Sequence, residues 1–424
     1  MQLLKVRVHT SRGISGHYKN HFESRHQDRL SSIKAMDQEP IGVQGSKRIV
    51  VIGGGIIGSS IAYYLSERGA KVTVLERECL AAAASGRAGG FLALDWNEST
   101  PLRHMSHLSY RLHQELSLKF GPEHIGYRPV HTYQVSGVET SAVKSPLKLR
   151  HRAERGPEGA LPPWVDGDMR FVEVIGSTSS TAQVHPRLLT EALMGCAVSR
   201  GSSMLIGTAC GLLQSADKRI MGVLVEDQDP VHADAVVIAM GPWTSQVSSW
   251  IPGLQVGNNI GQKYHSVVLR PQQLVSEHCL FTSFKYASGR IVQPELYPRP
   301  DGSVYVCGEP QSLPVPSSPQ EVRLDPSLSQ NLRSAAASMS SVLAAADVEA
   351  EQSCYLPLSP VSDGLPMVGQ VEEIPGLYVA SGHSCWGILH GPATGLMMSE
   401  LLLDGEVKCL PAECSAALCP SRTL

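Results

Sequence analysis

Residues 48–78 of this chain read RIVVIGGGIIGSSIAYYLSERGAKVTVLERE. The stretch opens with a short β-branched run at 48–52 that is apolar on both sides, which predicts a buried parallel strand. Gly53, Gly55 and Gly58 follow with the spacing G-x-G-x-x-G. In that spacing the glycines allow a tight turn, close approach of the backbone to a pyrophosphate, and close packing of a helix on the strand.

The residues after these glycines complete a strand–helix–strand unit. A helix is expected over 56–68, and Gly69 supplies the flexible residue that follows a helix end. The second strand, 71–76, ends at Glu76, where an acid accepts hydrogen bonds from ribose hydroxyls and disfavours a 2′-phosphate. The unit therefore predicts a dinucleotide other than NADP. By themselves these residues leave both NAD and FAD open.

The composition sets the class of protein. The chain has 424 residues, of which 42% are hydrophobic and 18% charged, so we expect two or three globular domains. A net charge of −3 does not favour nucleic acid as a partner, and no apolar run is long enough to span a bilayer. The ten cysteines contain no C-x-x-C pair, so neither a metal site nor a secreted disulfide framework is expected.

The two ends of the chain differ from its middle. Residues 1–46 carry several basic residues before the first acid, Glu23, which is typical of a mitochondrial or plastid transit peptide or of a disordered extension. We therefore expect a soluble intracellular protein, in the cytoplasm or, if the extension is a transit peptide, in one of those organelles. Residues 406–424 are expected to be a flexible tail.

The middle of the chain shows further elements. Residues 79–93 are rich in small side chains, which lets backbone lie close to a ligand. Residues 141–168 are charged and rich in Pro and Gly, which predicts an exposed excursion. A helix is expected to begin at Pro186, a buried strand at 233–243, and a mostly antiparallel sheet over 251–350.

Four motifs in order resemble the family of FAD-dependent oxidoreductases that contains D-amino-acid oxidase, glycine oxidase and sarcosine oxidase. They are VVIGGGIIGSSIAYYLSERGAKVTVLE, ASGRAGG, VVIAMGPWTS, and DGLPMVG followed by GLYVASGHSCWGI and GPATG. The stretches TAQVHP, YPRPDGSVYVCGE and CYLPLSPVSDGLP are similar to a eukaryotic branch of that family. The resemblance covers nearly all of residues 47–405 and implies that the nucleotide is FAD.

The resemblance implies an α/β fold with two domains. A Rossmann-like FAD-binding domain would be assembled from residues 47–108, 183–248 and 351–405. A substrate domain with a large mixed or antiparallel sheet would comprise residues 109–182 and 249–350.

The resemblance also implies a set of site residues. Those expected to bind FAD are Gly53, Gly55, Ile57, Gly58, Glu76, Arg77, Ser85, Ala88, Gly89, Gly90, Cys210, Gly241, Gly382, His383, Gly387 and Ile388. Trp386, His383 and Tyr264 are the candidates for a catalytic role at the flavin end. A helix with Pro392 in its first turn is expected to point its positive end at the flavin. His390 is expected to be structural.

The chain departs from the family pattern where an amino-acid substrate would bind. Leu356 stands where the family carries an arginine for the substrate carboxylate, and Cys385 stands near the place of a second arginine in glycine oxidases. Either change removes charge, so an amine fits better than an α-amino acid. The residues that could supply a replacement charge are Arg87, Lys263, Arg270 and Arg299.

Cys354 lies near the place where monomeric sarcosine oxidases attach flavin covalently. A buried free thiol is the simpler interpretation of this cysteine, so we expect FAD to be held without a covalent bond.

The expected function is oxidation of a carbon–nitrogen bond in a small amine or amino-acid-like molecule, with hydride transfer to flavin and reoxidation by O₂ or another acceptor. The alternative is a flavin-binding protein without turnover that acts as an assembly or trafficking factor. An NAD dehydrogenase would need a nicotinamide-site pattern that the sequence does not contain.

Overall fold

The computed structural model describes residues 47–139 and 161–423. The expected N-terminal extension and most of the expected excursion at 141–168 lie outside the described residues.

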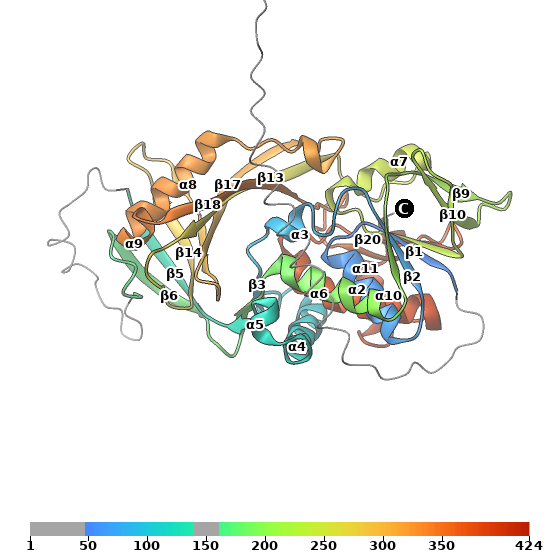
Figure 1. Cartoon of the computed structure of the whole chain (residues 1–424), viewed down its shortest axis with the longest axis horizontal. Helices are drawn as coiled ribbons and strands as arrows, with labels where there is room; N and C mark the ends of the chain where they lie inside the picture. Colours follow the sequence, from blue (N-terminus) through green and yellow to red (C-terminus); the bar gives the residue numbers. More distant parts are fainter. Residues whose placement is uncertain (1–46, 140–160, 424) are drawn as a thin grey trace, which may run out of the picture. The chain divides into compact units, whose positions relative to one another are not determined.

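A six-stranded sheet contains the first strand–helix–strand unit (Figure 1). Its strands, in spatial order, are β19 (Met367–Gln370), β20 (Leu377–Ser381), β12 (Ala235–Ile238), β1 (Ile49–Ile52), β2 (Val72–Glu76) and β8 (Ser203–Ile206). All neighbours are parallel except β19 and β20. The expected strands at 48–52, 71–76 and 233–243 therefore lie side by side in one sheet.

Both faces of this sheet are covered, as the apolar run at 48–52 predicts. Ile49 and Val51 point into one hydrophobic core, which they share with the helices. Val50 and Ile52 point into a second core, which they share with the small sheet β11-β10-β9. The strands of this small sheet are β9 (Ala209–Gln214), β10 (Ile220–Val225) and β11 (Val231–His232).

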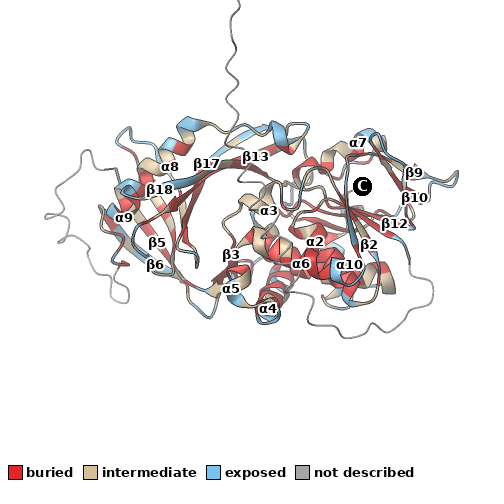
Figure 2. Cartoon of the chain, viewed as in Figure 1, coloured by how far each residue is buried: buried red, intermediate tan, exposed pale blue. Residues whose placement is uncertain are grey.

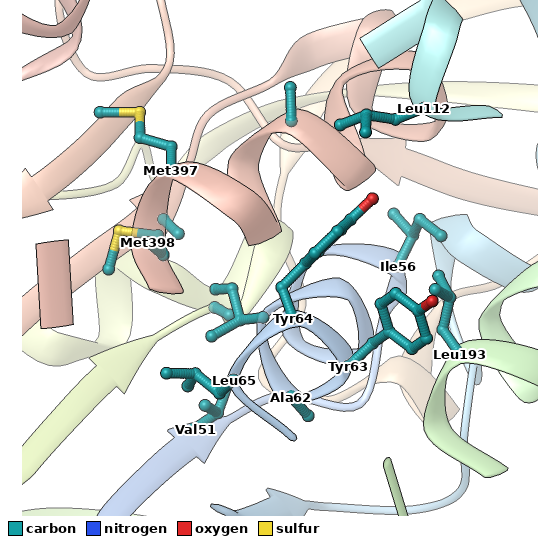
Figure 3. Packing of buried hydrophobic residues seen from close by; sticks show 14 of the residues in the cluster. Val51, Ile56, Ala62, Tyr63, Tyr64, Leu65, Leu112, Leu193, Met397 and Met398 are labelled. Carbon is teal, nitrogen blue, oxygen red and sulfur yellow. The ribbon is translucent and has the colours of Figure 1, made fainter. Parts of the chain in front are cut away.

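The helical face is built from α2 (Ile56–Glu67), α4 (Arg103–Phe120), α6 (Pro186–Ser199) and α10 (Gly387–Asp404). Figure 3 shows Tyr63, Tyr64 and Leu65 of α2 packing among side chains that include Leu193 and Met398. Helices α2 and α10 pack closely because Gly395 has no side chain. A Cβ at this position would lie 2.6 Å from the backbone of Ser60. Both helices are mostly buried (Figure 2).

A separate eight-stranded sheet is mostly antiparallel, as expected, with one parallel pair, β14 and β5. Its strands are β18 (Asp347–Leu356), β13 (Ile260–Arg270), β17 (Val304–Pro314), β16 (Glu295–Pro298), β14 (His278–Lys285), β5 (His131–Val138) and β6 (Met169–Gly176), with β15 (Ile291–Val292) paired to β14. Helix α8 (Pro326–Met339) packs against β13 and β17 (Figure 1). Leu332, Ala336 and Met339 of α8 fill the core beneath it.

The remaining elements are short. A small sheet consists of β3 (Phe91–Ala93), β7 (Thr181–Gln183) and β4 (Arg128–Pro129). The other helices are α3 (Ala84–Arg87), α5 (Pro122–Ile125), α7 (Val247–Trp250), α9 (Ser341–Ala344) and α11 (Ala412–Leu418), with 3-10 turns at Gly241–Gln246, Pro319–Glu321, Ser384–Trp386 and Pro420–Thr423.

Two expected domain limits differ from the structure. Helix α4 runs through the limit expected at residue 109 and packs against α10, because Tyr110, Leu112 and Leu116 belong to the same core as α2 and α10. Strand β18 runs through the limit expected at residue 351 and pairs with β13 along its whole length.

The expected flexible tail at 406–424 is also wrong for the residues that the structure describes. Cys414 and Leu418 of α11 are buried in the core shared with α4 and α10. Arg422 donates a hydrogen bond to Asp363 at 3.0 Å. The apolar side chains of the short helix α11 are buried by packing against other helices. The local sequence pattern did not indicate this packing.

Candidate active site

A large cavity begins at the carboxyl ends of β1, β2 and β12 and extends to the inner face of the eight-stranded sheet. Ligands of open α/β sheets bind at such strand ends. The residues at this end include Gly53, Gly55, Ile57, Glu76, Arg77, Ser85, Ala88, Gly89, Gly90, Ala209 and Gly241. The residues at the far end include Phe91, Trp96, Tyr264, Phe281, Glu295, Tyr297, Cys307, Leu356, His383, Cys385, Trp386, Gly387 and Ile388.

The glycine turn after β1 has no room for side chains. A Cβ on Gly53 would lie 2.3 Å from the carbonyl oxygen of Ala239, and Gly53 has φ +113°. A Cβ on Gly58 would lie 1.9 Å from the carbonyl oxygen of Gly53. The turn leads directly into α2, whose first N–H groups and dipole suit an anion. This cradle fits a pyrophosphate.

Glu76 lines the cavity and fixes the glycine turn at the same time. Its Oε2 accepts a hydrogen bond from the N–H of Gly54 at 2.7 Å, and its Oε1 accepts one from the N–H of Glu78 at 2.9 Å. Burial raises the pKa of Glu76, and these two backbone hydrogen bonds oppose the rise. The neighbouring Arg77 donates to the carbonyl of Ser317 at 2.6 Å.

The small residues at 84–90 pack closely against other elements. Ser85 accepts a hydrogen bond from the N–H of Ile56 at 2.9 Å, which ties α3 to the start of α2. A Cβ on Gly89 would lie 2.4 Å from the ring of Tyr297. A Cβ on Gly90 would lie 1.9 Å from the carbonyl oxygen of Val184. Because these two glycines have no side chains, the segment can pack directly against Tyr297 and Val184.

His383 lies in the loop after β20 and lines the cavity. Its Nε2 lies 3.0 Å from the hydroxyl of Thr394. Its buried Nδ1 has no hydrogen-bond partner among the described residues. Burial lowers the pKa of His383 to about 3, so the ring is neutral. An unpaired buried nitrogen beside a cavity fits a polar edge of a bound cofactor.

Helix α10 begins at Gly387, so Pro392 lies inside the helix and not in its first turn as expected. The proline lacks the N–H that would bond the carbonyl of Ile388. His113 of α4 satisfies that carbonyl from its Nε2 at 3.0 Å. Ser109 of α4 also bridges the helix, since its hydroxyl donates to the carbonyl of Leu389 and accepts from the N–H of Ala393. Tertiary contacts thus allow the earlier helix start, which leaves Gly387 and Ile388 facing the cavity.

His390 does not line the cavity. Its ring is fully buried, and its Nε2 lies 2.9 Å from the hydroxyl of Ser106. Burial, with the nearby His383 and His113, lowers the pKa of His390 to about 3.

The far end of the cavity contains an acid that sequence reasoning missed. Glu295 of β16 accepts a hydrogen bond from the hydroxyl of Tyr297, and the thiol of Cys307 lies 3.6 Å from the same oxygen. Burial raises the pKa of Glu295. Tyr264 of β13 also lines this end, and burial, with the charge of Glu295, raises its pKa. The sequence did offer one signal, because Glu295 and Tyr297 are two residues apart in one strand and therefore lie on the same face of the sheet.

None of the four expected replacement cations lines the cavity. Arg87 donates to the carbonyl of Ser353 at 2.8 Å, and Arg270 pairs with Glu349 at 2.7 Å. Arg299 donates to the carbonyl of Ala88 at 3.1 Å and lies over the ring of Tyr305. Lys263 is buried elsewhere, and burial lowers its pKa. Among the described residues that line the cavity, Arg77 is the sole arginine or lysine, and it lies beside Glu76.

Three expected FAD-binding residues do not line the cavity. Cys210 is exposed, with its thiol toward the carbonyl of Leu224, and the preceding Ala209 lines the cavity in its place because side chains alternate along β9. Gly58 packs beneath the glycine turn. Gly382 is buried next to Ser359, between two residues that do line the cavity.

The described residues contain no group of three or more His, Cys, Asp or Glu side chains that could hold a metal ion. Within the same residues, no helix has the length and hydropathy needed to cross a membrane.

Comparisons with known proteins show the family of the chain. Residues 48–401 match the family described as FAD dependent oxidoreductase, and residues 7–87 also match the one described as pyridine nucleotide-disulphide oxidoreductase. The chain is 31% identical over 391 residues to a protein of Schizosaccharomyces pombe named "putative oxidoreductase", which covers 86% of this chain and 96% of that protein.

Two further proteins are similar over most of the chain. The first is 4-methylaminobutanoate oxidase (formaldehyde-forming) of Paenarthrobacter nicotinovorans, with 25% identity over 84% of this chain and 44% of that protein. The second is the crystal structure of glycine oxidase from Geobacillus kaustophilus, with a TM-score of 0.67 and 21% identity over 89% of this chain and all of that one (100%). The family match spans most of the chain, and the glycine cradle fits the dinucleotide, so the protein belongs to the FAD dependent oxidoreductase family and FAD is its cofactor.

Proposed function

We propose that this enzyme oxidises the carbon–nitrogen bond of a small amine that carries no carboxylate next to the nitrogen. The observation that carries the proposal is the far end of the cavity, where Glu295 and aromatic rings stand and arginine and lysine are absent among the described lining residues. An α-carboxylate needs a cation, and the bidentate fork of arginine is its usual partner. The similarity to 4-methylaminobutanoate oxidase supports an amine as the reacting group.

The chain's own residues have distinct roles in this proposal. Gly53, Gly55 and the first turn of α2 hold the pyrophosphate, and Glu76 accepts hydrogen bonds from the adenosine ribose. The chemistry that FAD supplies when bound is acceptance of a hydride from the substrate carbon next to nitrogen. The first turn of α10, at Gly387 and Ile388, presents N–H groups to the cavity that stabilise negative charge on the cofactor.

Trp386 and Tyr264 are proposed to position the substrate. The two side chains line the same end of the cavity from different elements, the loop before α10 and strand β13. His383 is neutral because burial lowers its pKa to about 3. It is therefore proposed to hold the cofactor through Nδ1 and not to act as a proton acceptor for the substrate at neutral pH. Reoxidation then requires O₂ or another acceptor.

The test is an anaerobic absorbance titration of the purified holoprotein with primary, secondary and tertiary amines and with glycine and D-amino acids. The proposal predicts that an amine bleaches the flavin bands and that the amino acids do not. Bleaching by the amino acids alone would refute it.

The alternative is a flavin-binding protein without turnover. The same observation supports it, because no arginine or lysine among the described residues at the far end of the cavity replaces the two arginines that the sequence lacks. Flavin bands that no compound bleaches would favour this alternative.

A further inference from the structure

The far end of the cavity is walled by aromatic rings from several elements. Phe91 of β3, Trp96 and Phe281 of β14 form a mutual contact, with ring centroids 5.0 Å apart for Phe91 and Trp96 and 4.9 Å apart for Trp96 and Phe281. Trp386 joins this cluster at 6.3 Å from Trp96, and Tyr297 joins it at 5.7 Å from Phe91. All five rings line the cavity.

Glu295 lies beside this cluster. On β16 it pairs with Phe281 on one side and with Cys307 on the other, so its side chain stands within the aromatic wall. Both hydrogen bonds that it accepts, from Tyr297 and Cys307, go to Oε2. Within the described residues, no hydrogen bond reaches Oε1. The carboxyl also has no ion pair there, and Arg77, which is the sole arginine or lysine among the described residues that line the cavity, is bonded to Ser317 and Gln246.

We propose that Glu295, together with the aromatic rings around it, binds the cationic ammonium group of the substrate. This inference rests on the proposed function, which supplies the amine, and adds the residue that selects it. Because a protonated nitrogen has no lone pair, the ammonium would pass its proton to the Glu295 carboxylate before the hydride leaves the adjacent carbon. A cation is attracted both by a carboxylate and by the faces of aromatic rings, most strongly where water is excluded. A substrate with a carboxylate at the same place would meet the negative charge of Glu295 and no compensating cation.

The protonation of the neighbouring groups agrees with this assignment. Burial raises the pKa of Tyr264, Tyr297, Cys307 and Cys385, which face Glu295 from β13, β16, β17 and the loop before α10. These groups are therefore neutral near neutral pH and add no second negative charge beside Glu295. Burial also raises the pKa of Glu295 itself, as expected for a carboxyl that lacks a cationic partner. A bound ammonium would reverse that rise.

The experiment compares two non-reacting probes on the holoprotein. Choline carries a trimethylammonium group, and neohexyl alcohol is its neutral isostere with a tert-butyl group in its place. Affinities are measured by calorimetry and by the change in the flavin absorbance spectrum, so no turnover is required. The variants are Glu295→Gln, which keeps the shape and the acceptor for Tyr297, and Phe281→Leu, which removes one ring. The control is Glu173→Gln, at an exposed acid on β6 of the same sheet.

Choline is expected to bind more tightly than neohexyl alcohol. Glu295→Gln should weaken choline at least about 10-fold, because the attraction between the carboxylate and the trimethylammonium charge is lost, and leave neohexyl alcohol unchanged. Phe281→Leu should reduce the preference for choline, and Glu173→Gln should not. Equal binding of the two probes by the natural protein, or unchanged choline affinity in a Glu295→Gln protein that retains FAD, would overturn the inference.

Two further outcomes are informative. If Glu295→Gln fails to fold, the comparison of the two probes on the natural protein and on Phe281→Leu still decides the question. Choline binding that depends on Glu295, combined with flavin that no amine bleaches, would overturn the proposed oxidation and leave the ammonium site standing.

Discussion

The buried histidine His390 makes the stability of this protein depend on pH. Its ring is fully buried between α10 and α4, and burial lowers its pKa from 6.5 to about 3. In the unfolded chain the ring has its ordinary pKa, so between these two values the unfolded state binds the proton and the folded state does not. Stability is therefore present above the unfolded pKa and is lost as the pH falls below it.

The size of the effect follows from the two pKa values. At about pH 5, which is roughly 1.5 units below the unfolded pKa, protonation of this ring stabilises the unfolded state by roughly 2 kcal/mol. At about pH 7 this contribution to the free energy of unfolding is close to zero. His113 and His383, with pKa values lowered to about 4 and about 3, are expected to contribute similar amounts. Replacing His390 alone should thus remove about one third of the three histidines' combined pH dependence.

The assay is urea unfolding followed by circular dichroism at both pH values, with FAD at one saturating concentration. His390→Gln should lose roughly 2 kcal/mol less stability than the natural protein between about pH 7 and about pH 5. The control His104→Gln, at an exposed position of the same helix α4, should show the natural pH dependence. If the stability of His390→Gln depended on pH as strongly as that of the natural protein, the neutral, buried state of this ring would be refuted.

Three other predictions concern the cofactor and the substrate. Gly58→Ala should purify with little FAD, because its Cβ would lie 1.9 Å from the carbonyl oxygen of Gly53 and must push α2 away from the glycine turn. The flavin-to-protein absorbance ratio tests this prediction, and the same ratio in the variant as in the natural protein would contradict it. Trp386→Ala should change the ranking of amine substrates more than FAD content, because Trp386 belongs to the aromatic wall; an equal loss of FAD would show a structural role. Burial raises the pKa of the Cys354 thiol to about 11, so it stays protonated, and denaturation followed by ultrafiltration should release all flavin; flavin retained by the protein would indicate a covalent bond.

The sequence by itself determined the dinucleotide-binding part of the fold. The glycine spacing, the β-branched strands and Glu76 act within one short stretch, where local geometry dictates the residue types. The structure accordingly places Gly53, Gly55, Ile57 and Glu76 on one cavity. The strand at 233–243 was predicted from its own apolar run and the glycine that follows it. The loop from 382 was identified by its resemblance to the family.

Only the tertiary structure decided the substrate end and the element limits. In the sequence nothing distinguishes Glu295 from other strand residues. In the structure β14 and β17 place Phe281 and Cys307 beside it, although these residues lie elsewhere in the chain. Helix α10 begins before Pro392 because Ser109 and His113 of α4 supply the hydrogen bonds that the proline removes. Such partners are set by packing between elements far apart in sequence, and no local pattern of spacing or propensity encodes them.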